Sequence, residues 1–570
     1  MASSAISFQG VTSGLQTDQL VAAIIASDGQ AVQRLKDKQT FNTQRATALQ
    51  TMSSDMTSLS TALAALEDGF NARSITSTDS NNTYVTASAT SASSGSYEIK
   101  VASVASKGQI APTMSNGAPT NLAVADPAAA IATGAASFAV EGTDGVLKTF
   151  QLNNNSLNGL RDAINSSGAG VTATIINSGK GANPYQLVVT AKDTGTGATG
   201  GMVTLAAINN ADGSATSIKP SLGITAGTLT GTFDAPTGIT GGLTSSGDNV
   251  ARDAVFTVNG IELTRKTNVV TDAVSGVTFT LKKGDATNDT TLSITQDKSA
   301  ATTALQNVLT KYNTLVSNYK TATTSTKDTS SSTGDVIQGP LSNDATARTV
   351  MAQIRSTLMG SATGLPGTAT YSSTGSIGIK TAADGTLSLD TTIFQAALDK
   401  DPDAVKKVFT LSGTSTNGAV SMSSGGSKTM TGGVDFNITN YVSGGAVAGT
   451  FTVGGTSYNL SGSNGSLVGA AGTPIEGLSL SVSGKGTGTL NISRGVGQTL
   501  QDLVLSLTSY TGSMELAQTN ITNENKDLSD RIDSGQALLD KRQTVLKNQF
   551  AKMESDLSQM RSLSSSLSGA

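Results

Sequence analysis

DRIDSGQALLDKRQTVLKNQFAKMESDLSQMRSLSSSLSGA, residues 530–570, sets the architecture predicted for this chain. Its apolar residues recur every three, four or seven positions, which is the spacing of a coiled-coil seam. The seam begins just upstream and consists of Leu528, Ile532, Leu539, Leu546, Phe550, Met553, Leu557, Met560 and Leu567. The other faces carry Asp, Lys, Arg, Gln and Ser, and proline is absent. The sequence therefore predicts a long amphipathic helix whose apolar stripe requires burial.

A second helix is predicted near the N-terminus, over about residues 31–66, with Gly69 as its stop signal. Lys38, Asn42 and Arg45 interrupt its apolar seam. Polar residues at such positions weaken helix association but fix its register and partner number. Both intrachain pairing of the two helices and contact with another molecule are compatible with this pattern. For the extreme ends we expect contact with another molecule, because little sequence remains to cover them.

A short amphipathic helix, DQLVAAIIASD (18–28), is predicted before the second helix. Thr17 is placed to cap it, and the Asp28-Gly29 dipeptide is expected to end it. This segment extends the helical region almost to the N-terminus.

Between the terminal helices the apolar period changes from helical to two, which indicates short strands separated by glycine-rich turns. The stretches are YVTASA (84–89), SYEIKVASVA (96–105), SFAVEG (137–142), VTATII (171–176), QLVVTA (186–191), AVFTVNG (254–260), GVTFTLKK (276–283), TLSITQ (291–296), GTFTVGG (449–455), LSLSVSG (478–484) and TLNISR (489–494). One pattern occurs twice: AVFTVNG, GVTFTL and TLSIT in the middle of the chain resemble GTFTVGG, GLSLSV and TLNIS near its end. We therefore predict two related β-modules, and SFAVEG (137–142) is compatible with the start of a third.

Helical patterns return at 301–320, 344–360 and 391–409, and again from Gly497. The predicted fold class is α+β, elongated and multidomain, with terminal α-helical coiled-coil stalk or legs and inserted β-rich head domains. A chain of 570 residues is too long for one core. The predicted parts are a terminal helical leg (1–44 with 526–570), a helical stalk (45–80 with 297–410 and 496–525), a β-rich head (81–112 with 247–296), an outer β-rich head (113–246) and an additional inserted β domain (411–495).

Composition excludes several kinds of chemistry. The chain has no histidine and no cysteine, so His-based triads, thiol catalysis, disulfides and His or Cys metal sites are ruled out. Asp399, Asp401 and Asp403 have the spacing of calcium-loop ligands, but Ala404 replaces the required glycine. Asp401 is better interpreted as the cap of a helix that begins at Pro402. We expect no catalytic, cofactor-binding or metal-binding residues, although carboxylates distant in sequence could still form a glycosidase pair.

Charge and hydropathy also limit the partners. The net charge of −4 and the pI near 5.1 argue against a nucleic-acid partner. The early apolar run LVAAII (20–25) is too short to span a bilayer, and the first basic residue is Arg34. We therefore expect neither membrane insertion nor a cleaved signal peptide.

Four stretches, taken in order, resemble the flagellar filament cap family, also called hook-associated protein 2. They are GVTSGLQTDQLVAAIIASD (10–28), VNGIELTRKTNVVTDAVSGVTFTL (258–281), SIGIKTAADGTLSLDTTIFQAALDKDPDAVKKVF (376–409) and RIDSGQALLDKRQTVLKNQFAKMESDLSQM (531–560). LNGLRDAINSSGAGVTATIINSG (157–179) is similar to the small motif shared by flagellin and hook-associated proteins. The segment 411–495 departs from the family pattern, and its role stays open.

The resemblance implies a homo-oligomeric ring at the distal tip of an extracellular flagellum, which promotes flagellin folding and insertion. It also implies export by the flagellar type III system, an export chaperone on the C-terminal helix and contact with hook–filament junction proteins. An added role in adhesion is compatible with it. Expected oligomer or filament contacts are Leu15, Leu20, Ile24, Leu35, Asn42, Leu546, Phe550, Met553, Leu557 and Met560.

Two other classes fit parts of the sequence. A surface adhesin or phage-fibre-like module is compatible with the Ser/Thr/Gly-rich tracts at 88–96 and 323–334. Another axial protein, flagellin or a hook–filament junction protein, is compatible with the helical termini. The DPDAVKKVF and VNGIELTRKTN segments are more similar to the cap family.

Overall fold

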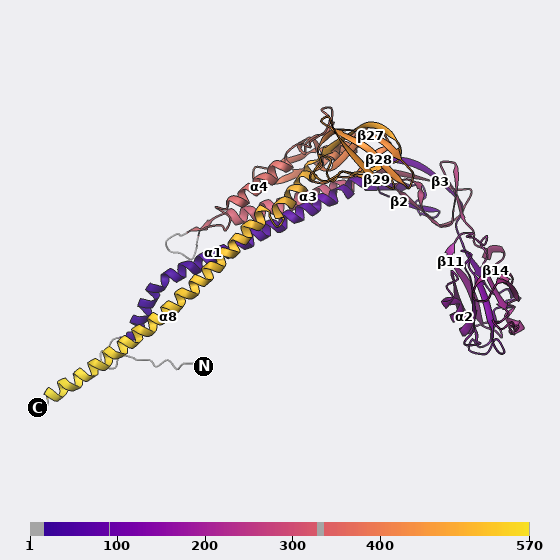
Figure 1. Ribbon diagram of the computed structural model, residues 1–570, viewed down its shortest axis with the longest axis horizontal. Coiled ribbons are helices and arrows are strands. Elements are labelled where there is room, and N and C mark those ends of the chain that lie inside the picture. Colours follow the sequence, from indigo (N-terminus) through magenta and orange to yellow (C-terminus); the bar gives the residue numbers. More distant parts are fainter. Residues whose placement is uncertain (1–15, 91, 328–335, 569–570) are drawn as a thin grey trace. The chain divides into compact units, whose positions relative to one another are not determined.

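The computed structural model describes residues 16–90, 92–327 and 336–568 (Figure 1). The chain folds into two compact units, Met1–Phe70 with Lys298–Ala570 and Asn71–Asp297. Each unit is described by itself. The division into five domains stays a prediction.

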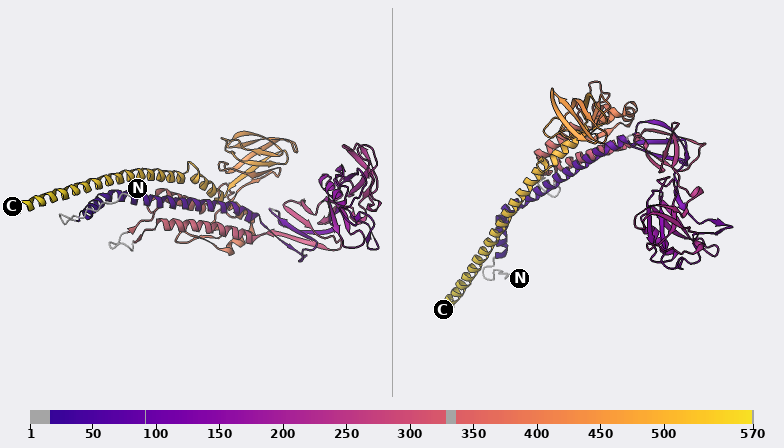
Figure 2. Two further views of the ribbon diagram at one scale, coloured as in Figure 1. Left: turned by 90° about the horizontal axis from the view of Figure 1, so that it is seen from below. Right: turned by 45° about the vertical axis from the view of Figure 1, so that its right-hand side comes forward.

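Two long helices run side by side in the first unit, in opposite directions: α1 (Thr17–Asn71) and α8 (Ser513–Ser568) (Figures 1 and 2). The predicted break at Gly29 and the predicted stop at Gly69 are both wrong, because α1 passes through both residues. Gly29 faces Leu539 of α8, and a Cβ atom added at Gly69 would lie 2.5 Å from Cβ of Ala304 on a neighbouring helix. The glycines allow neighbouring helices to approach closely, and the surrounding contacts keep α1 helical.

One hydrophobic core joins α1 and α8 to shorter helices. These helices are α3 (Lys298–Thr323), α4 (Ala345–Leu358), α5 (Thr391–Lys400), α6 (Pro402–Phe409) and α7 (Val496–Thr508). Phe70 stacks on Phe409 with ring centroids 5.9 Å apart, and the fully buried Tyr312 donates to the Gly385 carbonyl at 3.2 Å. The predicted cap is confirmed, since Asp401 Oδ1 accepts the Ala404 amide at 2.9 Å. The short strands of this region are β21 (Thr326–Lys327), β22 (Val336–Ile337), β23 (Ile379–Thr381) and β24 (Leu387–Leu389), and the one-turn helix η3 spans Gly375–Ile377.

The second unit contains a β-module, here called module A, with its own hydrophobic core. Its strands are β1 (Arg73–Ser77), β2 (Val85–Ala89), β3 (Gly95–Ser103), β16 (Ala254–Val258), β17 (Ile261–Arg265), β18 (Val269–Val274), β19 (Val277–Leu281) and β20 (Asp289–Gln296). They form a five-stranded sheet, β1-β20-β3-β16-β17, and a three-stranded sheet, β18-β19-β2.

A second β-module, module B, lies in the first unit around a separate core. Its strands are β25 (Leu411–Ser415), β26 (Val420–Ser424), β27 (Gly432–Tyr441), β28 (Ala446–Val453), β29 (Thr456–Ser463), β30 (Ser466–Val468), β31 (Ser479–Val482) and β32 (Gly486–Arg494). They form one eight-stranded sheet in the order β25-β32-β27-β28-β29-β30-β31-β26.

The two modules have the same strand order when their strands are matched in sequence, so the predicted repeat is confirmed. The hairpins β16–β17 and β28–β29 both turn on two residues of positive φ, Asn259-Gly260 and Gly454-Gly455, as tight right-twisted hairpins require. In module B, residues 442–445 connect β27 to β28. The corresponding connection in module A, β3 to β16, carries the remaining residues of the unit.

Those remaining residues pack around another core, in which helix α2 (Leu157–Ser166) covers a sheet with Leu157, Leu160 and Ile164. Two four-stranded sheets have the orders β10-β11-β4, with β7 against β11, and β15-β12-β8-β9, and the pairs β13-β14 and β5-β6 form two-stranded sheets. Their strands and the shorter elements are β4 (Lys107–Ile110), β5 (Met114–Ser115), β6 (Ala118–Pro119), β7 (Ala123–Val124), β8 (Ser137–Glu141), β9 (Leu147–Gln151), β10 (Val171–Asn177), β11 (Tyr185–Thr194), β12 (Thr204–Ile208), η1 (Pro220–Leu222), β13 (Gly227–Gly231), β14 (Pro236–Gly241), β15 (Leu243–Thr244) and η2 (Gly247–Asn249).

We expect the first unit to fold without module B. The Gly495 amide donates to the Thr410 carbonyl at 2.9 Å, so deleting 411–494 joins residues that already touch. Circular dichroism and limited proteolysis of the deletion variant should show a folded helical core. Deleting 402–494 is the matched control and should unfold that core, because it also removes the buried Phe409. Equal loss of structure in both variants would contradict the prediction.

A turn in module A should respond to strong acid. The Asp285 carboxylate accepts hydrogen bonds from the Thr287 hydroxyl at 2.6 Å and the Thr287 amide at 2.9 Å, which lower its pKa to about 2. A lowered folded-state pKa gives stabilisation that is present above the usual aspartate range near 4 and is lost as the pH falls towards 2. An NMR titration should place the Asp285 carboxyl midpoint near 2; a midpoint near 4 would contradict these bonds. Asp285→Asn should remove that titration.

Candidate functional site

The terminal parts of α1 and α8 pair with each other over residues 17–38 and 528–554, a region called the leg here. Val21, Val32, Leu528 and Ile532 are buried in it. A Cβ atom added at Gly535 would lie 2.8 Å from Cγ2 of Val32, so the helices are close at this level. The leg is thus an antiparallel helix pair with a narrow apolar contact.

Two ion pairs join the helices, one midway along the leg and one where it meets the rest of the first unit. Asp28 pairs with Arg542 at 2.7 Å, and Lys38 pairs with Glu524 at 2.7 Å. The Lys38 ammonium lowers the pKa of Glu524, against the opposing effect of partial burial. All four side chains are at least one-third exposed, so each pair contributes no more than about 1 kcal/mol. Their main effect is to fix which sides of the two helices meet.

An apolar surface lies on the same side of the leg as these ion pairs. Leu20 and Ile24 precede Asp28 at intervals of four residues, which places them along one helix face. Leu538 lies four residues before Arg542 and Val545 three residues after it, so both lie on the matching face of α8.

The exposed fractions of these side chains are large. Leu20 is 46% exposed, Leu538 67% and Val545 52%, whereas Ile24 and Leu35 are half-buried. Leu35 belongs to the same side because it lies three residues before Lys38. The five residues Leu20, Ile24, Leu35, Leu538 and Val545 are called the leg face. Its residues are all aliphatic, which is the composition that contacts the apolar side of an amphipathic helix.

Comparison with known sequences identifies the relatives of this chain. A family profile described as the flagellar hook-associated protein 2 C-terminus matches residues 251–562, and the corresponding N-terminus profile matches residues 13–108. The chain belongs to the flagellar hook-associated protein 2 family. A profile of the flagellin hook IN motif matches residues 142–193, which include the small motif predicted from the sequence.

Individual relatives agree with this assignment. The B-type flagellar hook-associated protein 2 of Pseudomonas aeruginosa is 30% identical over 417 residues, covering 70% of this chain and 80% of the relative. Flagellar hook-associated protein 2 of Escherichia coli K12 is 29% identical over 407 residues, covering 70% and 79%. A crystal structure of the D1, D2 and D3 domains of the Escherichia coli flagellar cap protein has the same fold, with a TM-score of 0.52, 24% identity and coverage of 83% of this chain and 99% of that one.

The predicted contact residues of this chain occupy different environments. Phe550 is half-buried and lines a cavity of about 200 Å³ together with Thr17 and Val21 of α1. Met553, Leu557 and the 70% exposed Met560 line a shallow groove on α8 itself. The oligomer or filament contacts of these residues stay predictions.

The remaining predicted contacts also differ from one another. Leu546 is half-buried. Asn42 is only 4% exposed and is covered by its own chain. Leu15 lies outside the described residues. Leu538 and Val545 were not among the contacts predicted from the sequence, because they lie off the heptad seam. The Leu538-Leu539 doublet was the feature that indicates apolar residues on two faces of α8.

The polar residues that interrupt the predicted α1 seam have different partners in the structure. Lys38 pairs across the leg, as described above. Arg45 instead contacts Asp344 Oδ2 at 2.7 Å, and the Asp344 side chain is fully buried where it caps α4 by accepting the Ala347 amide. Arg45 therefore stabilises the first unit's own core and is unavailable to a seam partner. A coiled coil with another chain stays a prediction.

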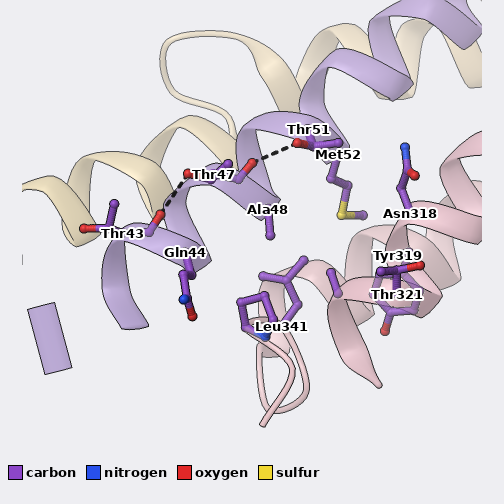
Figure 3. Close-up of a pocket in the computed structure, with 12 residues that line it drawn as sticks. Thr43, Gln44, Thr47, Ala48, Thr51, Met52, Asn318, Tyr319, Thr321 and Leu341 are labelled. Carbon is purple, nitrogen blue, oxygen red and sulfur yellow. Dashed lines mark hydrogen bonds between the residues drawn. The ribbon is translucent and has the colours of Figure 1, made fainter. Parts of the chain in front are cut away.

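A groove of about 430 Å³ lies between α1 and α3 (Figure 3). The Thr43, Thr47 and Thr51 hydroxyls each donate to the carbonyl four residues earlier, at 2.9, 3.0 and 3.0 Å. Their methyl groups and the side chains of Ala48 and Met52 remain to form the α1 side of the groove. No Asp, Glu, Lys or Arg lines it. The groove therefore offers no carboxylate or amine for acid–base chemistry.

Metal coordination has no evident location in the described part of the chain. In residues 16–90, 92–327 and 336–568, no group of three or more Asp or Glu side chains could hold a metal ion. The same residues contain no helix with the length and hydropathy of a membrane span.

In each β-module, an arginine on the first or last strand binds a loop of the same module. This end of the module, where the chain enters and leaves it, is called the root here. Arg494 is 8% exposed and donates to the carbonyls of Gly426 at 2.7 Å and Thr429 at 2.9 Å, while it pairs with Asp502 of α7. Arg73 of module A likewise donates to the Ala92 carbonyl at 2.6 Å. In both modules the acceptors lie in the loop between the second and third strands, so the two roots are built alike.

Arg494→Ala should destabilise module B by about 3 kcal/mol, since it leaves two carbonyls and a partly buried carboxylate without their donor. Urea unfolding followed through module B measures the change. Lys428→Ala is the control, because the Lys428 side chain is 73% exposed in its pair with Glu476 and should cost less than about 1 kcal/mol. Similar losses in the two variants would overturn the anchoring role of Arg494.

Proposed function

We propose that this chain caps the flagellar filament: a homo-oligomer at the distal tip that promotes the folding and insertion of flagellin. Membership of the hook-associated protein 2 family supports this role. The solved relative from Escherichia coli is described as a flagellar cap protein. The observation that carries the proposal within this chain is the leg face, because it offers an apolar helix-binding surface built from both ends of the sequence.

The leg face is suited to reversible helix binding. Fully burying an exposed Leu or Val side chain contributes roughly 1.5–3 kcal/mol. Leu20, Leu538 and Val545 are exposed in the single chain, so an amphipathic helix laid over them gains apolar burial without any covalent step. We infer that this helix belongs to flagellin or to a neighbouring cap subunit. Each incoming flagellin would then be held while it folds.

The remaining parts receive roles consistent with this arrangement. The helical core of the first unit supports the legs, and the β-modules form the outer part of the cap. Hook–filament junction proteins are the proposed contacts before the filament grows. Export by the flagellar type III system, without a cleaved signal peptide, and an export chaperone on the C-terminal part of α8 complete the proposal.

Leu538→Gln with Val545→Gln should impair capping without unfolding the chain, because both side chains already face solvent. In a strain that lacks its own copy, we expect short filaments, reduced swimming and unpolymerised flagellin in the medium. Light scattering of the purified variant against concentration tests whether its oligomer is weakened as well.

Leu505→Gln is the matched control, since Leu505 is 67% exposed on α7, outside the leg. Its filaments should be of normal length. Normal filaments with the double leg variant would rule out the leg face as the contact surface. Normal filaments in a strain lacking the whole chain would reject the cap function itself.

A further inference from the structure

The connection between the fifth and sixth strands differs between the two β-modules. In module B, β29 and β30 are neighbours in one sheet, and the turn Asn464-Gly465 joins them. In module A, β17 and β18 lie in different sheets, and residues 266–268, called the clasp here, join them. Module A also carries the insertion between its third and fourth strands, residues 107–250, which is called the outer head here. The clasp turns towards this insertion.

Asn268 of the clasp fixes the point at which the chain leaves module A. Its side-chain oxygen accepts the Ala105 amide at 2.7 Å, and its side-chain nitrogen donates to the Ala105 carbonyl at 2.9 Å. The Asn268 carbonyl accepts the amide of Leu281, a core residue of module A, at 2.8 Å. Ala105 is buried, so the Asn268 side chain satisfies two backbone groups that have little access to water.

A loop of the outer head, residues 194–196, binds directly beside this point. The Thr194 hydroxyl donates to the Lys266 carbonyl of the clasp at 2.6 Å. The Gly195 amide donates at 3.0 Å to the carbonyl of Ser106, the residue that follows Ala105. The loop is therefore bonded both to the clasp and to the segment that the clasp holds.

Asp253 binds the same loop from the segment by which the chain returns to module A. Its carboxylate accepts the Thr196 amide at 2.7 Å and the Thr196 hydroxyl at 3.1 Å. Gly195 is buried between Asp253 and the clasp, and a Cβ atom added there would lie 2.7 Å from both Asp253 Oδ1 and Lys266 Cβ. The φ of +88° at Gly195 also disfavours a side chain. The loop can approach module A this closely because residue 195 is a glycine.

Module B contains a smaller version of the same contact. The Asn464 amide donates to the Gly445 carbonyl at 2.8 Å, so its fifth-to-sixth connection also binds its third-to-fourth connection. In module B that connection is the short segment 442–445, whereas in module A it is the outer head. A single turn contact in one module thus corresponds to a set of hydrogen bonds in the other, and the larger set occurs where an insertion must be held.

We propose that the clasp and Asp253 lock the outer head to module A, so that these two parts of the second unit move as one rigid body. Parts of a chain joined by a small polar contact ordinarily move relative to each other. The chain crosses between these two parts at 104–106 and at 251–253, and the loop 194–196 adds a noncovalent third attachment. Under the proposed cap function the locked pair would act as one building block; the lock itself does not rest on that function.

The two crossing segments are also paired with each other, since Ser106 and Arg252 form an isolated β-bridge. If this bridge alone restrained the outer head, loss of the clasp bonds would leave its motion unchanged. The distribution of distances between two spin labels, one on each part, distinguishes these two cases because it reports the spread of orientations directly.

Pulsed electron paramagnetic resonance of the purified full-length protein tests the proposal. The chain has no cysteine, so two introduced cysteines carry the only labels. Thr76→Cys on β1 and Thr174→Cys on β10 place them at exposed positions of module A and the outer head. Mixing with an excess of unlabelled protein removes distances between subunits. The wild-type background should give one narrow distribution, as narrow as that of Thr76→Cys with Glu262→Cys, which lie on the same sheet of module A.

The variant Asp253→Ala with Asn268→Ala should broaden the distribution between the two parts at least about twofold, because only the crossing segments then join them. The matched control is Asp285→Ala with Asn288→Ala, which removes hydrogen bonds between the same residue types in a turn of module A that does not contact the outer head. Its distribution should stay narrow.

A broad distribution in the wild-type background would overturn the lock, and this measurement needs no variant to fold. A narrow distribution in the Asp253/Asn268 variant would overturn it as well, provided that the label pair within module A shows a folded sheet. If that sheet is disturbed, Gly195→Val decides, because it separates the loop from the clasp while leaving the residues of module A intact. It should also broaden the distribution, and an unchanged distribution would reject the proposal. None of these readouts depends on filament growth, so the cap function is judged separately by the leg-face variants.

Discussion

The antiparallel contact between α1 and α8 is the interaction on which the first unit depends. These helices come from opposite ends of the sequence, so their pairing closes a loop that contains nearly the whole chain. Loop closure costs entropy, although the cost grows only slowly with loop length. The core around Leu49, Met56, Leu309 and Ile521 offsets it by burying apolar side chains from five further helices. Once α1 and α8 are paired, both ends of the described chain contribute to one surface, the leg face.

Each β-module can be inserted into the chain without separating the flanking segments, because its first and last strands are paired with each other. Arg73 pairs with Gln296 across the first and last strands of module A, and Leu411 pairs with Arg494 in module B. A module with adjacent ends disturbs the helices that flank it very little. The shared strand order shows that one β-fold is used twice, once with a short turn between its third and fourth strands and once with a large insertion at the same connection. The arginine at each root ties the module's own loop to its first or last strand.

The chain lacks two of the side chains that most often carry covalent chemistry. Without histidine or cysteine, it has no side chain whose ordinary pKa lies near neutrality and no thiol to oxidise. Under the proposed cap function, assembly depends on which apolar faces are exposed, and the leg face is one such surface. Exposed ion pairs such as Asp28–Arg542 add alignment but little free energy.

Local patterns in the sequence were enough to predict the terminal helices, the alternating strands, the repeated module and the Asp401 cap, because each depends on residues near one another along the chain. The same local reasoning failed at Gly29 and Gly69, where contacts with other helices override the weak helix propensity of glycine. It also could not pair Arg45 with Asp344, which lies almost 300 residues away. The sequence by itself determined which side chains require burial or a partner. Only the tertiary structure decided which of these side chains find that burial or partner within the chain and which, such as Leu538 and Val545, remain exposed. The physical reason is that an amphipathic period shows that a helix face needs burial, but does not show which surface will cover it.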